Sequence, residues 1–438
     1  MSMMVKRLQL ALIHTAVAVT LVPINSTLNR VMIKELGISA ALVALLASLP
    51  YVFSPLQVII GSYSDRHPVL GLRRTPYIVL GLLFCAAGVV LAPLAAVEIP
   101  VQPILGLFLT LLVFMAWGMG FNLASVSYLA LASEISGEKG RSRTVAIMWV
   151  MMVVGIILTA ATLGGMLERF DYAALNRAFL TVAAGALMLG ALGLIGLEKK
   201  VSGQSAAVSP DEEREPWQSI FHKVFANPEA RLFFGYLLLL LTALLGQDIL
   251  LEPYAAEAFN LSVSATTRIT SIWGGVMLIT MLVTGFLETR LAKKTLARAG
   301  GWVGVLGFAL IAVSGLLAQR GMFYGGVVLL GAGTGIATIS NLSLMLDMTT
   351  RRVGLYIGAW GVASALARVV GNLLSGVLRD AVNLMSQNPL AGYLTVFVLQ
   401  GLFLLISLFL LSRVDVRRFQ ERERLTFVER AAIAGDLS

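Results

Sequence analysis

The stretch GMGFNLASVSYLAL, residues 118–131, returns in altered form 213 positions later as GAGTGIATISNLSL, residues 331–344. The positions that match hold small or apolar residues: Gly118 and Gly331, Gly120 and Gly333, Ala124 and Ala337, Ser127 and Ser340, Leu129 and Leu342, Leu131 and Leu344. After a shift of two positions, Arg141, Trp149 and Gly165 match Arg352, Trp360 and Gly376. Self-similarity at a fixed offset indicates a duplicated architecture. The chain is therefore predicted to fold as two similar halves.

The composition indicates what surrounds these halves. Of the 438 residues, 58% are apolar and 13% are charged, and the mean hydropathy is +0.85. Soluble domains carry about 25% charged residues, so most of this surface must face a lipid bilayer. A membrane-spanning helix needs about 20 apolar residues, and the apolar stretches predict twelve spans. These cover residues 8–33, 40–62, 75–97, 103–132, 144–167, 178–197, 232–259, 267–288, 300–318, 322–348, 354–378 and 391–411.

The predicted fold is all-α, with two pseudo-symmetric six-helix halves in an integral membrane protein. The halves are residues 1–197 and 232–412, joined by a cytoplasmic linker, 198–231, and followed by a cytoplasmic tail, 413–438. With this topology, 25 of the 33 Lys and Arg residues fall on the side that holds both termini. The positive-inside rule makes that side the cytoplasm, in a bacterial inner or intracytoplasmic membrane. The net charge of +9 is then an orientation signal, and nucleic acid is excluded as a partner.

Several function classes are disfavoured by what the sequence lacks. Cys85 is the single cysteine, so an intramolecular disulfide or a Cys-based metal motif is excluded, and there are only three histidines. No nucleophile elbow, phosphate-binding Gly-rich loop or metal-spaced His/Cys/Glu set occurs in an aqueous segment. We therefore expect a protein that is not an enzyme and has no certain cofactor.

Two parallel six-span halves are the arrangement of the major facilitator fold, whose working cavity lies at the membrane midplane between the halves. The loop after the second predicted span resembles the cytoplasmic loop motif of that superfamily through Gly61, Asp65, Arg66, Gly71, Arg73 and Arg74. Residues 67–70 are inserted into the usual spacing. We interpret Gly61, Asp65, Arg66, Arg73 and Arg74 as a conformational latch, in which charges engage a neighbouring helix end.

Charged and polar side chains inside a predicted span mark the candidate cavity, because such groups are costly in a membrane. In the seventh span, Asp248 and Glu252 are four residues apart and share a helix face. Pro253 follows and is expected to kink the span near Ile249. Interhelical ion pairing with Arg30 and Arg368 is the competing, purely structural interpretation of the two carboxylates.

The string GQDILLEPY, residues 246–254, resembles the seventh-span signature of the PucC/LhaA group, the bacteriochlorophyll-delivery family of the major facilitator superfamily. Further similar segments are NSTLNRVMI at 25–33 with ELG at 35–37, GAGTG at 331–335, GAWG at 358–361, AR at 367–368 and GN at 371–372. The resemblance runs from about residue 8 to residue 419. It implies an assembly factor for photosynthetic antenna complexes that handles bacteriochlorophyll or chlorophyll as cargo. Antenna polypeptides and pigment synthase are the implied partners.

Two other functions remain open from the sequence. An ordinary secondary transporter would use the same carboxylates to couple a proton gradient to movement of a small solute. A scaffold with a vestigial cavity would bind partners through its outer helix faces. The sequence does not decide whether the protein forms oligomers.

The candidate ligand-binding residues are those that can pair with charge or hydrogen-bond a ligand in the cavity. They are Gln247, Asp248, Glu252, Pro253, Tyr254, Asn25, Asn29, Arg30, Asn341, Arg368 and Asn372. His14, in the first predicted span, could offer an imidazole nitrogen to the central Mg of a pigment. A hydrogen bond to a neighbouring helix is the commoner role for such a histidine.

Overall fold

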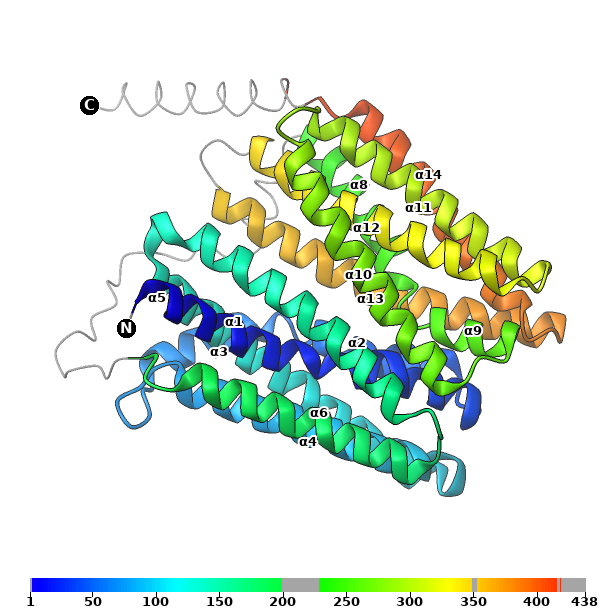
Figure 1. The fold of residues 1–438 in the computed structure, drawn as a ribbon, viewed down its shortest axis with the longest axis horizontal. Helices are drawn as coiled ribbons and strands as arrows, with labels where there is room; N and C mark the ends of the chain where they lie inside the picture. The colour runs from blue at the N-terminus through cyan, green and yellow to red at the C-terminus, as the bar shows by residue number, and fades with distance from the viewer. Residues whose placement is uncertain (1, 199–227, 349–352, 416–417, 419–438) are drawn as a thin grey trace.

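The computed structural model describes residues 2–198, 228–348, 353–415 and 418, and this part of the chain is almost wholly helical. Figure 1 shows long helices that lie side by side, with residues 2–198 in one group and residues 228–413 in the other. The sequence predicted this division into two halves. The predicted linker, 198–231, and the predicted tail, 413–438, lie largely outside the described residues.

The amino-terminal half begins with a helix that changes its winding. It comprises α1 (Met3–Val19), the π-helical segments η1 (Pro23–Leu28) and η2 (Val31–Glu35), α2 (Ala40–Val52), α3 (Leu56–Arg66), α4 (Thr75–Val101), α5 (Pro103–Met166) and α6 (Tyr172–Leu194). Helix α5 contains two predicted spans, and Gly137 at φ +61° separates them. Glycine adopts this left-handed conformation without steric cost, so the chain turns back there.

Among its described residues, the carboxyl-terminal half contains one broken span and five continuous helices. It comprises α8 (Pro228–Gly246), α9 (Leu251–Phe259), α10 (Val263–Leu287), α11 (Lys293–Leu316), α12 (Arg320–Met348), α13 (Val353–Ser386) and α14 (Ala391–Arg413). Asn260, at φ +51°, ends α9 in the left-handed conformation that asparagine tolerates. The Ser262 hydroxyl then accepts a hydrogen bond from the Ala265 amide and caps α10.

The predicted spans agree with these helices apart from two corrections. Eleven helical segments among the described residues are long and apolar enough to cross a membrane. The second predicted span, 40–62, is instead divided between α2 and α3, because the backbone leaves the helix at residues 53–55. The seventh, 232–259, is divided between α8 and α9. With the divided second span, the described residues provide twelve candidate membrane spans.

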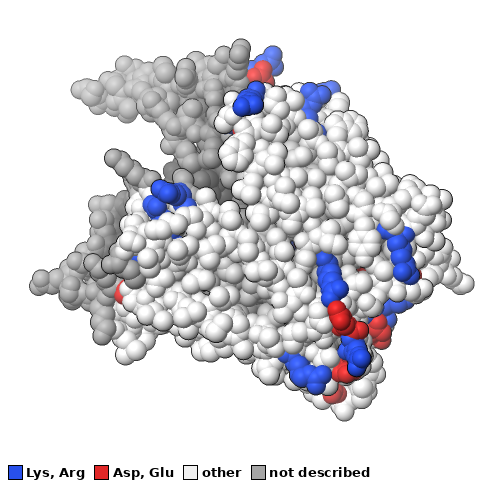
Figure 2. All heavy atoms as spheres, in the orientation of Figure 1, with Lys and Arg blue, Asp and Glu red and all other residues white. Residues whose placement is uncertain are grey.

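The two ends of the helices define two sides of the molecule. The terminal side holds Ser2 and Val414, and the distal side holds Gly37 and Asn260. On the face in Figure 2, charged side chains gather towards the two ends, and a broad uncharged band lies between them. Such a band is the surface that a bilayer requires, so the protein is a multi-pass membrane protein.

Glycines pack the helices of each half in the same way, and these contacts explain the internal repeat. A Cβ on Gly81 of α4 would lie 2.6 Å from the Ala124 nitrogen of α5. A Cβ on Gly300 of α11 would lie 2.9 Å from the nitrogen of Ala337, the repeat partner of Ala124. The matched residues therefore support equivalent close helix approaches in both halves.

We predict that Gly81→Ala and Gly300→Ala each lower the thermal unfolding midpoint of the purified protein. The added methyl group meets backbone atoms that cannot rotate away, and such overpacking costs about 1–3 kcal/mol. Gly185→Ala in α6 is the matched control, since a Cβ there has no atom within 4 Å. Equal losses in all three variants would contradict the proposed close packing.

Candidate functional site

The break in the seventh span is the centre of the candidate site. Helix α8 ends at Gly246, residues 247–250 form turns, and α9 begins at Leu251. Pro253 lies in the first turn of α9, where its missing N–H is tolerated, so the chain breaks where the proline predicted a kink. Gly246 also lies against Gly371 of α13, with the Gly371 carbonyl carbon 2.9 Å from a Cβ built on Gly246. The two glycines therefore let α8 lie close to α13.

Asp248 lies in this break and pairs with Arg368 of α13. The Arg368 Nη1 donates to Asp248 Oδ2 at 2.8 Å, and the guanidinium carbon lies 5.0 Å from the centre of the Tyr51 ring. Gln247 Nε2 donates to the other carboxylate oxygen at 2.9 Å. The Asp248 and Arg368 side chains keep 27% and 25% of their surface exposed. The pair is thus oriented by both halves while part of it stays accessible.

Glu252, one turn after Asp248, joins the halves directly. Its Oε1 accepts hydrogen bonds from Ser26 Oγ of η1 at 2.5 Å and from Thr270 Oγ1 of α10 at 2.7 Å. Glu252 is 4% exposed, and its Oε2 is buried without a hydrogen-bond partner. All described hydrogen-bond donors to Glu252 are therefore neutral hydroxyl groups, and all of them donate to the same carboxyl oxygen, Oε1.

Further polar contacts between the halves gather between this level and the distal side. The Thr27 and Thr267 hydroxyl groups lie 3.1 Å apart, and Arg30 donates to the Leu261 carbonyl at 3.3 Å. Arg30 also pairs with Glu35. Two ion pairs cross between the halves, Lys34 with Glu257 at 2.6 Å and Arg268 with Glu168 at 2.6 Å, and the Ala41 amide donates to Asp380 at 2.8 Å. These contacts hold the distal side closed.

The remaining predicted cavity residues lie in different surroundings. Tyr254 is fully buried in the carboxyl-terminal half, where its hydroxyl donates to the Ile311 carbonyl at 2.8 Å. Asn341 accepts from the Tyr236 hydroxyl at 2.6 Å within the same half. Asn372 contacts Ser48 across the halves at 3.3 Å. The structure therefore brings Asn372 to the interface and places Tyr254 and Asn341 in packed helix contacts.

Asn25 and Asn29 lie at the π-helical segments of the first span. Asn29 Nδ2 donates to the Asn25 carbonyl at 2.7 Å, and both side-chain carbonyl oxygens are buried without a partner. Short π-helical segments occur often at functional sites. Unsatisfied acceptors also remain on Gln247 and Asn372. A ligand or water with N–H or O–H groups would satisfy such oxygens.

His14 of α1 lies apart from this interface, inside the amino-terminal half. Its ring stacks on Tyr128, with 5.2 Å between the ring centres, and meets the edge of Trp149 at 6.2 Å. His14 is 8% exposed, and its Nδ1 is buried without a hydrogen-bond partner. One nitrogen is thus unpaired, as a ligand to Mg requires, but the ring is closely packed.

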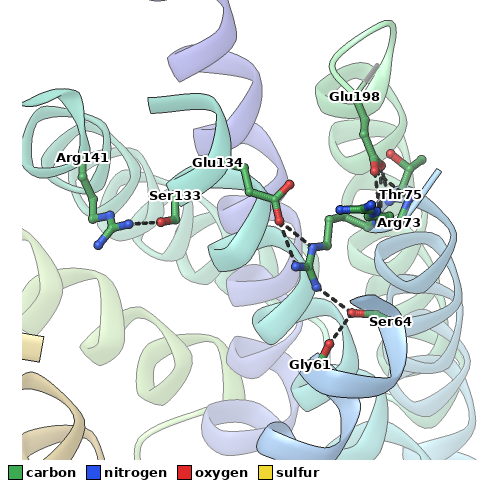
Figure 3. A network of polar contacts seen from close by, with 9 residues as sticks. Gly61, Ser64, Arg73, Thr75, Ser133, Glu134, Arg141 and Glu198 are labelled. Carbon is green, nitrogen blue, oxygen red and sulfur yellow. Dashed lines mark hydrogen bonds and ion pairs between the residues drawn. The ribbon is translucent and has the colours of Figure 1, made fainter. Parts of the chain in front are cut away.

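Figure 3 shows the environment of the predicted latch residues on the terminal side. Arg74 donates to Glu134 Oε1 from Nε at 3.0 Å and from Nη2 at 2.8 Å, and to Ser64 Oγ at 2.6 Å. Ser64 in turn donates to the Gly61 carbonyl at 2.9 Å. Arg74 therefore ties together α3, the start of α4 and the end of the fourth span.

Glu198 completes this network at the start of α4. Its carboxylate accepts from the backbone amides of Arg73 at 2.7 Å, Arg74 at 3.0 Å and Thr75 at 2.7 Å (Figure 3). A carboxylate at a helix amino terminus satisfies unpaired amides and opposes the helix dipole. Arg66 is exposed, and the Asp65 side chain lies outside the described structure. The described contacts of the latch residues stay within one half, so their action across the cavity stays a prediction.

Sequence reasoning did not select several residues that complete the site. Tyr51, Ser26 and Thr270 contact the predicted charges, and Glu134 and Glu198 hold Arg74. Ser26 lies inside the quoted stretch 25–33, and Glu134 follows the repeat, so both carried a weak signal. Tyr51 and Thr270 are ordinary residues within apolar spans, and only the helix packing shows their role.

The whole fold is that of known transporters. A crystal structure of a bacterial homolog to the human lysosomal transporter Spinster superimposes with a TM-score of 0.71 at 15% identity, covering 94% of this chain and 97% of that one. The D-xylose–proton symporter structure gives a TM-score of 0.70 at 14% identity, covering 95% and 98%. The protein therefore has the major facilitator fold.

Sequence comparison defines the family within this fold. The family model described as PUCC protein matches residues 27–419, and the chain belongs to that family. Protein PucC of Rhodobacter capsulatus is 29% identical over 422 residues, which cover 92% of this chain and 90% of that protein. The bacteriochlorophyll synthase 44.5 kDa chain of the same species is 29% identical over 419 residues, which cover 94% and 95%.

We predict that Arg74→Gln destabilises the amino-terminal half, because Glu134 and Ser64 lose their shared donor. Leaving the buried Ser64 hydroxyl unsatisfied costs about 1–3 kcal/mol, whereas water can replace Arg74 at the half-exposed Glu134. The expected readouts are a lower unfolding midpoint and faster proteolysis of the loop at 67–74. Arg66→Gln removes an exposed arginine from the same motif and should have little effect. Equal destabilisation by both changes would show that Arg74 has no special role.

Proposed function

We propose that this protein assists the assembly of light-harvesting complexes by handling bacteriochlorophyll or chlorophyll and newly inserted antenna polypeptides. The observation that carries the proposal is the family match. The matched residues, 27–419, include nearly all of the polar interface between the halves, so the candidate site lies within the family region. The relative named as a bacteriochlorophyll synthase chain supports a pigment context. Antenna polypeptides and pigment synthase are the proposed partners.

The site would bind its cargo without making or breaking covalent bonds. Asp248, Arg368 and Gln247 combine a partly exposed ion pair with an unsatisfied amide oxygen. Arg368 can donate to a pigment carbonyl from its remaining N–H groups, and Tyr51 would hold its guanidinium in place. At a separate position inside the amino-terminal half, His14 would supply a nitrogen ligand to a pigment Mg. A binding role of this kind makes the protein a non-enzymatic carrier.

The proposed location is the photosynthetic inner or intracytoplasmic membrane, with the terminal side in the cytoplasm. Basic residues support this orientation, since Arg7, Arg74 and Lys294 all lie on the terminal side with many others. Pigments and antenna helices are themselves apolar and reside in that membrane. Pigments and antenna helices could therefore contact the lipid-facing surface of this protein directly, without an extramembrane domain.

We predict that the affinity-purified protein, gently solubilised from a photosynthetic host, carries pigment together with antenna or synthase polypeptides. The measurement is an absorption spectrum with pigment extraction and identification of the co-purifying chains. A colourless preparation without these partners would contradict the proposal. Solute movement by such a preparation in vesicles would make it a secondary transporter, and normal antenna assembly with Asp248→Asn would favour a scaffold.

Arg368→Gln should lower the pigment-to-protein ratio several-fold, because it removes the cation that pairs with Asp248 and faces the cargo. Breaking a pair of this kind also leaves the carboxylate uncompensated, so the folded fraction must be measured in parallel. Arg177→Gln is the control, since Arg177 is an exposed arginine near the distal start of α6. Equal pigment content in the two variants would show that Arg368 does not contribute to pigment binding.

His14→Phe tests the metal-ligand role by a separate change. Phenylalanine keeps a planar ring beside Tyr128 and removes both nitrogen atoms. Pigment retention should fall if His14 ligates Mg, with a shift in the absorption band of any pigment that remains. Unchanged retention and an unchanged spectrum would show that His14 is a packing residue.

A further inference from the structure

The hydrogen bonds of Glu252 are distributed unevenly over its carboxyl group. Oε1 accepts from both Ser26 and Thr270, and Thr270 Oγ1 also lies 3.2 Å from Ser26 Oγ. Oε2 is buried and has no hydrogen-bond partner within the part of the chain that the structure describes. A carboxylate would gain from donors on both oxygens, whereas a carboxylic acid has one accepting carbonyl oxygen and one hydroxyl group. The neutral acid, with Oε1 as its carbonyl oxygen and Oε2 as its hydroxyl oxygen, is the less costly form here, because an unpaired hydroxyl costs less to bury than a charge.

The charged groups around Glu252 are already paired with other partners. In the preceding break, Asp248 pairs with Arg368. In the first span, Arg30 pairs with Glu35 and Lys34 pairs with Glu257, the other carboxylate of α9. In α10, Arg268 pairs with Glu168. An ionised Glu252 would then be an uncompensated buried charge, which is strongly unfavourable.

Glu252 also occupies the innermost position of the contacts that close the distal side. Ser26 belongs to the amino-terminal half, while Glu252 and Thr270 belong to the carboxyl-terminal half. The Thr27–Thr267 contact and the Lys34–Glu257 pair follow in the distal direction. On the terminal side, by contrast, the described contacts of Arg7 with Thr144 and of Lys294 with Val414 each stay within one half. Separating the halves distally would expose Glu252 to water.

We propose that Glu252 binds and releases a proton, and that the proton-bound carboxyl locks the distal side of the two halves together. When the halves separate, the carboxyl loses Ser26 and gains water, and one proton passes from its oxygen to that water. The resulting carboxylate resists burial, so the distal side stays open until it is protonated again. This proton-linked lock does not depend on which cargo the protein handles.

The sign of the pH dependence follows from this cycle. The closed state holds one proton more than the open state, so acid favours closure and rising pH favours distal opening. Glu252→Gln keeps the shape and can still accept from Ser26 and Thr270 through its amide oxygen, but it has no proton to release. That variant should therefore stay closed at every pH.

The test is a distance measurement between spin labels on the two halves in lipid nanodiscs, without pigment. Tyr172→Cys and Ser386→Cys place labels at exposed distal positions, and native Cys85 is buried and is replaced by alanine in the parent protein. With the wild-type carboxyl, the long-distance population should grow from mildly acid to alkaline pH. With Glu252→Gln the short distance should persist. A wild-type distance independent of pH, or an equal response in Glu252→Gln, would overturn the proposal.

Two further variants separate the lock from a general loss of packing. Glu257→Gln removes a carboxylate of the same helix that is paired with Lys34, and it should retain the pH response. Thr270→Val removes one donor to Glu252 and should move the opening midpoint. Infrared spectroscopy gives an independent readout, because the band of a protonated carboxylic acid should be lost in Glu252→Gln. If no such band is present at acid pH, Glu252 is not protonated and the proposal fails. Since no pigment is used, these outcomes are separate from those that test the assembly role.

Discussion

Charge in a low-dielectric interior must be paired or neutralised, and this constraint organises the interface between the two halves. Arg30, Lys34, Arg268 and Arg368 each have a carboxylate partner in the structure. Among the described residues, Glu252 forms no ion pair and instead accepts from two hydroxyl groups. These polar contacts add to the close packing of α2 on α13 and of α5 on α10, which also holds the two halves together.

Packing within each half follows a different principle. Glycines allow α4 to approach α5 and α11 to approach α12 closely, and the equivalent contacts of Gly81 and Gly300 give the halves a common framework. Arg74 and Glu198 then fix the terminal ends of the amino-terminal half. Close apolar helix contacts thus dominate the packing within each half, whereas the interface between the halves is rich in polar contacts.

The sequence predicted the features that depend on local composition. The lengths of the apolar stretches predicted the spans, the internal repeat predicted the two halves, and Pro253 indicated the break before α9. The span prediction, made from apolar length, passed over the break at residues 53–55, although Ser54 and Pro55 form a local turn signal there. It also grouped Tyr254 with Asp248 and Glu252, since they are close in sequence. In the helix Tyr254 points into an aromatic cluster with Phe323, Tyr393 and Phe397, away from the other half. Contacts such as Ser26 with Glu252 depend on how two distant helices meet, and a single sequence does not contain that information.

The short helix α9 connects the two parts of the site mechanically. Its nine residues begin three positions after Asp248, carry Glu252 in the first turn and are anchored by Tyr254. The turns at 247–250 separate α9 from α8, so α9 can tilt without moving the whole span. A cargo group that draws Arg368 away from Asp248 would release the start of α9 and weaken the contact of Glu252 with Ser26. A movement of α9 would separate Asp248 from Arg368 and Glu252 from Ser26 together, because the two carboxylates are one helical turn apart. Cargo binding and closure of the distal side would then oppose each other.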